Sequence, residues 1–161
     1  MSGGRIMASA SMAARFGLFA VLVYAGMLKL HDPRPASEFL HSLLGAASSE
    51  LPTRSIARGA GMGEIAVALA LVIVPGWRAG AVAGGAIFTA FAVLHGMAMA
   101  GGVSKACGCL GKGAFADVPP AGRIAINTAC AALCAWLAVR RDAAAWTIAG
   151  TSEGDAAEAS S

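Results

Sequence analysis

Two cysteines separated by one glycine, Cys107 and Cys109, are the residues in this sequence best suited to chemistry. Gly108 permits the backbone angles that a small disulfide ring between them would need, and such a ring is strained. A strained disulfide is easily reduced, which suits it to carry oxidising equivalents rather than to staple a fold. Lys105 and Lys112 flank the pair, and positive charge favours the reactive thiolate. The motif predicts thiol–disulfide redox chemistry.

Two other interpretations of the cysteine pair stay open. It could be a chance pair in a glycine-rich loop, or it could supply two soft ligands for Cu(I), since His95, Met97 and Met99 precede it closely. Met97 and Met99, however, lie two residues apart on an expected helix and point to different faces, so core packing is the simpler role for them. We expect packing for Cys130 and Cys134 as well, because a free cysteine in an apolar helix usually behaves as a small hydrophobe.

The composition indicates the environment in which this chemistry would take place. Hydrophobic residues make up 57% of the 161 residues, charged residues make up 13%, and the mean hydropathy is +0.68. These values disfavour a disordered chain and an ordinary water-soluble enzyme. The net charge of +3 is spread along the sequence, and aromatic residues are few, so we expect no nucleic-acid partner. A small integral membrane protein in contact with the lipid bilayer remains.

Charged residues divide the apolar sequence into four expected membrane spans, at about residues 13–30, 57–75, 79–100 and 122–140. Basic residues near the span ends are expected to extend to the membrane interface: Arg15, Lys29, Arg123 and Arg140. The spans predict an all-α, integral membrane four-helix bundle over residues 11–141. It would follow an N-terminal segment, 1–10, and precede a flexible tail, 142–161. A soluble bundle is the rival, but its helices would need polar stripes that these segments lack.

Local signals add detail to this bundle. The first span should be retained as an anchor, because no small-residue cleavage site follows Leu30. Pro33 and Pro35 should end it, and Ser37 is expected to cap a short helix that lies on the membrane. Glycines four residues apart predict close helix contacts in the second and third spans: Gly59 with Gly63, and Gly80 with Gly84.

Polar residues gather at the end of the bundle that carries the cysteine loop. They are Tyr24, Glu64, His95, Asn127 and Thr128, and the spacing places Glu64 and His95 each about 9 Å inside their helices. Polar groups in lipid are costly, so this set is either a hydrogen-bonded plug or a site. The distribution of Lys and Arg weakly favours termini outside, whereas cysteine usage suits an oxidising compartment. We expect the cysteine loop on the extracytoplasmic side of the cell inner membrane.

Several of these segments resemble the MauE/DoxX-like family of redox-associated membrane proteins. They are the run Gly26-Met-Leu-Lys-Leu-His-Asp-Pro33, Leu51-Pro52, Glu64, and Cys107-Gly-Cys-Leu-Gly111. The resemblance covers about residues 11–140, which includes all four expected spans. It is strongest to the methylamine utilisation protein MauE branch, in which Phe usually follows the Cys-Gly-Cys motif; Leu110 takes that place here.

The resemblance implies a DoxX-like four-span bundle whose loop cysteines work with an extracytoplasmic thioredoxin-like partner. In the methylamine system, such a protein is implicated in maturing the disulfide-rich small subunit of methylamine dehydrogenase. Cys107 and Cys109 match the thiol motif, and Lys29 and Glu64 match recurrent family positions. The other two cysteines match nothing in the family pattern.

The resulting hypothesis is a membrane thiol–disulfide oxidoreductase or maturation factor in which Cys107 and Cys109 are catalytic. Lys29, Glu64 and His95 would tune the thiols or place an electron acceptor. A quinone is the acceptor considered, because these polar groups lie at membrane depth. The alternatives are a non-catalytic docking or assembly subunit and a Cu(I)-handling membrane protein.

Overall fold

The computed structural model describes residues 3–45, 52–73, 76–103 and 118–140. These residues form five helices and no strands. In chain order the helices are α1 (Gly3–His31), α2 (Arg34–Leu44), α3 (Thr53–Val72), α4 (Trp77–Ala100) and α5 (Pro120–Val139). Four of them are long and apolar enough to span a membrane: Ser9–His31 within α1, and all of α3, α4 and α5.

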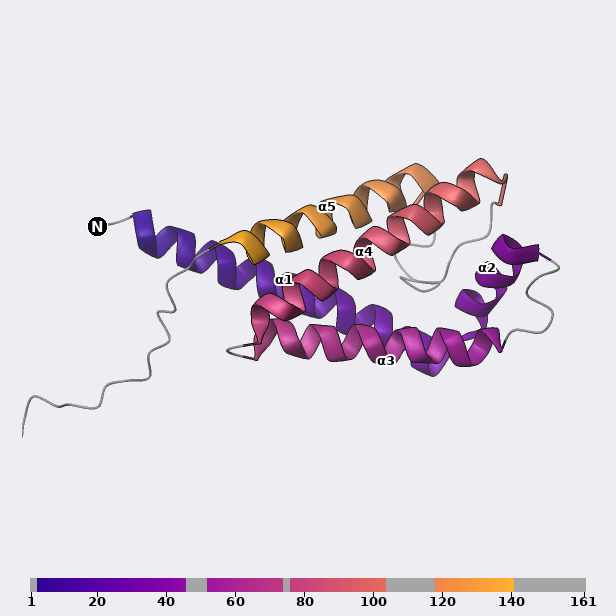
Figure 1. The fold of residues 1–161 in the computed structure, drawn as a ribbon, viewed down its shortest axis with the longest axis horizontal. Coiled ribbons are helices and arrows are strands. Elements are labelled where there is room, and N and C mark those ends of the chain that lie inside the picture. Colours follow the sequence, from indigo (N-terminus) through magenta and orange to yellow (C-terminus); the bar gives the residue numbers. More distant parts are fainter. Residues whose placement is uncertain (1–2, 46–51, 74–75, 104–117, 141–161) are drawn as a thin grey trace, which may run out of the picture.

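The four long helices run antiparallel to their neighbours in the chain and form two pairs, α1 with α3 and α4 with α5 (Figure 1). Helices α3 and α4 join the pairs, and the short α2 lies at one end of the bundle. We call this the α2 end; it also holds the last residues of α1 and α4 and the first residues of α3 and α5. Val103 and Val118, which flank residues 104–117, are therefore both at the α2 end.

The outer surface of the helices is apolar. Large hydrophobic side chains on every long helix are at least half exposed, including Phe16 (50%), Met62 (65%), Val82 (64%) and Val139 (78%). Water-soluble monomers do not expose apolar surface on this scale, whereas lipid tails cover it without cost. The predicted all-α, integral membrane four-helix bundle is confirmed, and the chain is a multi-pass membrane protein.

The main core lies between the two helix pairs. Leu22, Leu71 and Leu137 are at most 1% exposed and bring together α1, α3 and α5, while Phe88 adds α4. Because lipid is as apolar as these side chains, close packing rather than exclusion of water holds this core. A smaller second cluster, built on Phe39 of α2 and Ala98 of α4, closes the α2 end.

Helix α2 packs into the bundle. It begins at Arg34, so the expectation that Ser37 caps it is wrong. Pro35 is tolerated in the first turn, where the backbone N–H has no helical acceptor, and the helix therefore starts earlier than the prolines suggested. Ser37 instead lies on the buried side, where its Oγ is 3.1 Å from Oγ1 of Thr53 in α3.

The closest approach of α1 and α3 occurs at two glycines. A Cβ added to Gly26 would lie 2.6 Å from the carbonyl oxygen of Gly61, and one added to Gly61 would lie 2.8 Å from the carbonyl oxygen of Gly26. Neither position has room for a side chain. The backbones therefore cross in direct contact, as small residues allow in membrane helices.

The expected glycine contacts are correct on α4 and wrong on α3. A Cβ on Gly80 would lie 2.6 Å from the backbone nitrogen of Leu71, and one on Gly84 would lie 3.3 Å from Sγ of Cys134. In contrast, a Cβ on Gly59 or Gly63 would meet no atom of the described residues within 4 Å. Gly61, between them, faces α1 instead.

Arginines and tryptophans mark the end opposite α2. Arg15 Nε donates a 2.8 Å hydrogen bond to the carbonyl of Leu71, which satisfies a carbonyl in the last turn of α3, and its guanidinium lies 5.3 Å from the Trp77 ring centre. The guanidinium of Arg140 lies 4.1 Å from the ring centre of Trp136. Such a belt is typical of a membrane–water interface.

The glycine crossing yields a test with a matched control. Gly61→Ala should force α1 and α3 apart and lower stability by about 1–3 kcal/mol, the usual cost of overpacking. Gly63→Ala, on the same helix, should be neutral or stabilising by up to about 1 kcal/mol, since alanine is the better helix former. Thermal unfolding of both variants in detergent measures the difference. Equal stability of the two variants would contradict the contact.

Candidate functional site

The predicted catalytic cysteines, Cys107 and Cys109, lie outside the described residues, as do Lys105 and Lys112. The structure therefore does not test their geometry. What it does describe is the part of the bundle to which their segment is attached. The three supporting residues of the prediction, Lys29, Glu64 and His95, are all described, and all three are buried.

Lys29 and Glu64 form an ion pair inside the bundle. Lys29 Nζ lies 2.7 Å from Oε1 and 2.8 Å from Oε2 of Glu64, and the two residues are 2% and 1% exposed. The expectation that Lys29 extends to the membrane interface is therefore wrong. Its ammonium group turns inward because the Glu64 carboxylate on α3 accepts two of its hydrogen bonds. At the membrane interface, lipid headgroups would have to accept them instead.

The glycine crossing makes room for this ion pair. A Cβ on Gly61 would lie 3.0 Å from Cβ of Lys29, and a Cβ on Gly26 would lie 3.4 Å from Cβ of Glu64. Each charged side chain thus starts directly over the glycine of the opposite helix. Because the two glycines have no side chains, the aliphatic parts of Lys29 and Glu64 fit between α1 and α3. This places the two charges in contact.

The ion pair is enclosed by further groups. Lys29 Nζ lies 3.4 Å from the carbonyl oxygen of Ala25, one turn earlier in α1, and 5.1 Å from the ring centre of Phe91 in α4. A lysine over an aromatic face is attracted by the ring quadrupole. The ammonium group therefore links α1 to both α3 and α4, which belong to different helix pairs.

His95 of α4 is buried, and one of its ring nitrogens has no partner among the described residues. Its Nδ1 lies 2.7 Å from the carbonyl oxygen of Phe91, and its ring centre lies 5.7 Å from that of Phe39 in α2. The residue is 4% exposed, yet Nε2 has no hydrogen-bond partner among the described residues. A buried polar atom without a partner is costly, so it requires an explanation.

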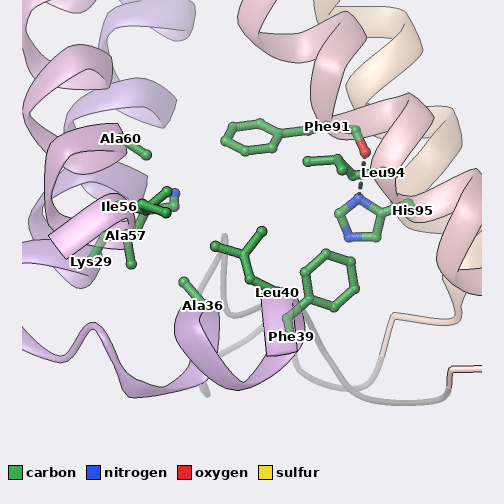
Figure 2. Close-up of a pocket in the computed structure, with 10 residues that line it drawn as sticks. All are labelled: Lys29, Ala36, Phe39, Leu40, Ile56, Ala57, Ala60, Phe91, Leu94 and His95. Atoms are coloured by element: carbon green, nitrogen blue, oxygen red, sulfur yellow. Dashed lines mark hydrogen bonds between the residues drawn. The ribbon is translucent and has the colours of Figure 1, made fainter. Parts of the chain in front are cut away.

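A pocket of about 160 Å³ separates Lys29 from His95 at the α2 end (Figure 2). Its lining comes from all helices except α5: Lys29, Ala36, Phe39, Leu40, Ile56, Ala57, Ala60, Phe91, Leu94 and His95. Apart from Lys29 and His95, these side chains are entirely hydrocarbon. Figure 2 shows Phe91 reaching into the pocket from α4 and Leu40 rising into it from α2. Lys29 and His95 thus line an apolar pocket on opposite sides, and their polar atoms have no surface in it.

The other residues of the expected polar cluster do not join this site. Tyr24 is 45% exposed, and Thr128 is also exposed. Asn127 is buried, but its Nδ2 donates a 2.8 Å hydrogen bond to the carbonyl of Arg123 in its own helix. Three of the expected polar groups thus lie elsewhere, because equal depth along the helices does not bring residues together around one pocket.

The remaining sulfur-containing residues divide between core and surface. Met97 and Met99 are 56% and 52% exposed, so the expectation that they pack in the core is wrong: both lie on the outer side of α4. Cys134 is fully buried in the main core with Cys130 packed beside it, as expected. In the described ranges, no three His, Cys, Asp or Glu side chains come close enough to hold a metal ion.

Sequence reasoning found the three site residues but missed the ion pair and the pocket. A signal for the pair was present. Gly26 precedes Lys29 by three residues, and Gly61 precedes Glu64 by three residues. Residues three apart share a helix face, so each charge lies beside a glycine where another helix can approach.

Comparison with known proteins yields one family match. The family described as methylamine utilisation protein MauE matches residues 7–140, which includes the four long apolar helices and the connection between α4 and α5. No curated protein matches the chain significantly, and no solved structure does so.

The ion pair can be tested by a double-mutant cycle. Lys29→Met and Glu64→Met should each lower stability by about 3–5 kcal/mol, because each leaves the partner buried without its counterpart. The double variant Lys29→Met/Glu64→Met should lose far less than the sum of the single Met variants, since no charge remains in the bundle. Arg58→Gln, at an exposed position of α3, serves as the control. Thermal unfolding in detergent measures all variants; strictly additive losses would contradict the pair.

Proposed function

Since the chain belongs to the MauE family of methylamine utilisation proteins, we propose that it is a membrane thiol–disulfide redox protein using Cys107 and Cys109. The family match, which includes the Cys-Gly-Cys motif, is the observation that carries this proposal. The partner is an extracytoplasmic thioredoxin-like protein, and the cysteine segment faces the extracytoplasmic side of the inner membrane.

The reaction is a dithiol–disulfide exchange. A thiolate of the reduced partner attacks the disulfide between Cys107 and Cys109, forms a mixed disulfide and releases one cysteine as a thiol. The second partner thiol then attacks the mixed disulfide, so that the partner leaves oxidised and the cysteine pair is left as a dithiol. Two electrons and two protons have moved to the pair. The oxidised partner introduces disulfides into its client, as the disulfide-rich small subunit of methylamine dehydrogenase requires.

The buried site supports this proposal by its position. The described residues on both sides of the cysteine segment, Val103 and Val118, lie at the α2 end, where Lys29 and His95 line the pocket. In this role Glu64 holds Lys29 in place, and the pocket accepts the molecule that reoxidises the dithiol. In this proposal, the polar groups at the α2 end have a functional role in addition to packing.

The exchange is tested in a single turnover with the full-length protein in detergent. Oxidised protein mixed with one equivalent of reduced thioredoxin should transfer its disulfide, measured as the loss of alkylatable thioredoxin thiols. Cys107→Ser/Cys109→Ser should abolish the transfer. Cys130→Ser, the same change in α5, should leave it intact. When the single loop variants are mixed with oxidised thioredoxin instead, one of them should trap a mixed disulfide, formed as its remaining thiolate attacks the thioredoxin disulfide, and a reductant should release it. If disulfide transfer to thioredoxin persists in Cys107→Ser/Cys109→Ser, the redox proposal is wrong and only a docking role remains.

Sidedness is tested separately by alkylation of intact cells with a membrane-impermeant maleimide. Cys107 and Cys109 should be labelled only after reduction, because they are paired in an oxidising compartment. Cys134 is fully buried and should stay unlabelled, and it provides the internal control. Labelling without prior reduction would show free thiols and contradict the redox cycle, and labelling only after cell lysis would place the segment in the cytoplasm.

A further inference from the structure

Two arginines from different helices lie beside one tryptophan at the end of the bundle opposite α2. The guanidinium carbon of Arg15 in α1 is 5.3 Å from the ring centre of Trp77 in α4, and that of Arg78 is 5.4 Å from the same ring centre. Two positive charges gathered around one ring repel each other, and they repel more strongly where lipid lowers the dielectric constant. The arrangement therefore favours an anion that compensates both charges.

No carboxylate in the described ranges compensates these two arginines. The acidic residues within those ranges are Asp32, Glu38 and Glu64. Asp32 and Glu38 lie beside or within α2, at the other end of the bundle, and Glu64 is engaged by Lys29. The compensating anion must therefore come from outside this part of the chain.

Both guanidinium groups are held in place and retain N–H donors. Arg15 donates from Nε and Nη2 to the carbonyls of Leu71 and Val72, at 2.8 and 3.3 Å, and Arg78 donates from Nη2 to the carbonyl of Arg140 at 2.8 Å. A guanidinium has five N–H donors in a planar fork that suits phosphate oxygens. Nη1 of each arginine bonds to no atom of the described residues, so both can donate to one anionic group.

The surface next to the arginines is apolar, which indicates that the anion carries hydrocarbon. Arg78 is exposed, and Val82, one turn later on the same helix face, is 64% exposed. Ile73, at the end of α3, is 59% exposed. A free inorganic anion gains nothing from these side chains. A phospholipid places its phosphate at the arginines and its chains along the apolar surface, as basic sites between membrane helices allow.

We infer that Arg15 and Arg78 together bind the headgroup phosphate of an anionic phospholipid such as phosphatidylglycerol, whose chains lie along Ile73 and Val82. Phosphatidylcholine is disfavoured, because its own quaternary ammonium group already balances its phosphate. The bound lipid links α1 to α4, which belong to different helix pairs. This inference does not depend on the redox role of the cysteines.

Binding is tested by the quenching of Trp77 fluorescence with brominated lipids. The full-length protein carries Trp136→Phe/Trp146→Phe, so that Trp77 is its remaining tryptophan. It is reconstituted into bilayers that contain increasing fractions of brominated phosphatidylglycerol or brominated phosphatidylcholine. Bromine quenches only at short range, so the two titrations report which lipid lies beside this ring. Phosphatidylglycerol should be preferred, and Arg78→Gln should lower the preference about fivefold, the contribution of one arginine near anionic lipid.

Matched variants separate charge at this site from charge elsewhere. Arg78→Lys keeps the charge and should retain most of the preference. Arg58→Gln removes an exposed arginine from the α2 end of α3 and should change nothing at Trp77. Arg15→Gln should also lower the preference about fivefold. Because this variant loses hydrogen bonds to α3 as well, helical circular dichroism shows whether it is folded, and Arg78→Gln decides alone if it is not.

Three outcomes would overturn the lipid site. The first is equal quenching by the two brominated lipids in the reporter protein. The second is a preference for phosphatidylglycerol that Arg78→Gln leaves unchanged. The third is displacement of brominated phosphatidylglycerol by soluble glycerol phosphate at the same concentration, which would show that the arginines bind a phosphate without need of its hydrocarbon chains.

Discussion

The ion pair between Lys29 and Glu64 is the interaction on which the α2 end depends. Burying one uncompensated charge among membrane helices costs about 2.5–3.5 kcal/mol on insertion scales. Here, each charge has its opposite within 2.8 Å and both are at most 2% exposed, so the pair enters the bundle as a neutral unit. Lipid offers no hydrophobic force to bring helices together, and paired polar groups with close packing replace it. The pair thereby specifies that α1 associates with α3 in one register.

The two glycines and the two charges form one arrangement. Gly26 and Gly61 bring the backbones into contact, and this contact leaves the space in which the stems of Lys29 and Glu64 lie. Larger residues at the crossing would separate the charges. Loss of the charges would remove the ion pair that holds the two helices together at this point. Phe91 of α4 faces the ammonium group across the helix pairs. The same interaction therefore also orients one wall of the pocket.

The sequence predicted the helices more accurately than their faces. Apolar length between charges gave four spans, and the last one, expected at about 122–140, is observed at Pro120–Val139. The third helix begins at Thr53 rather than about residue 57, because Arg54 and Arg58 point outward and need not end it. Glycine spacing indicated the wrong face of that helix. Which residue meets α1 depends on the register of two segments far apart in the chain, and one sequence does not contain that information.

The placement of Lys29 shows the same limit in energetic terms. Considered alone, a lysine at the end of an apolar span is most stable when it extends to water. Glu64 reverses this preference, but only when the fold brings it close. His95 poses the opposite problem: its burial could be predicted from an apolar helix, whereas the absence of a partner for Nε2 among the described residues could not. Glu64 satisfies the charge on one side of the pocket, and the nitrogen on the other side has no partner in the described chain.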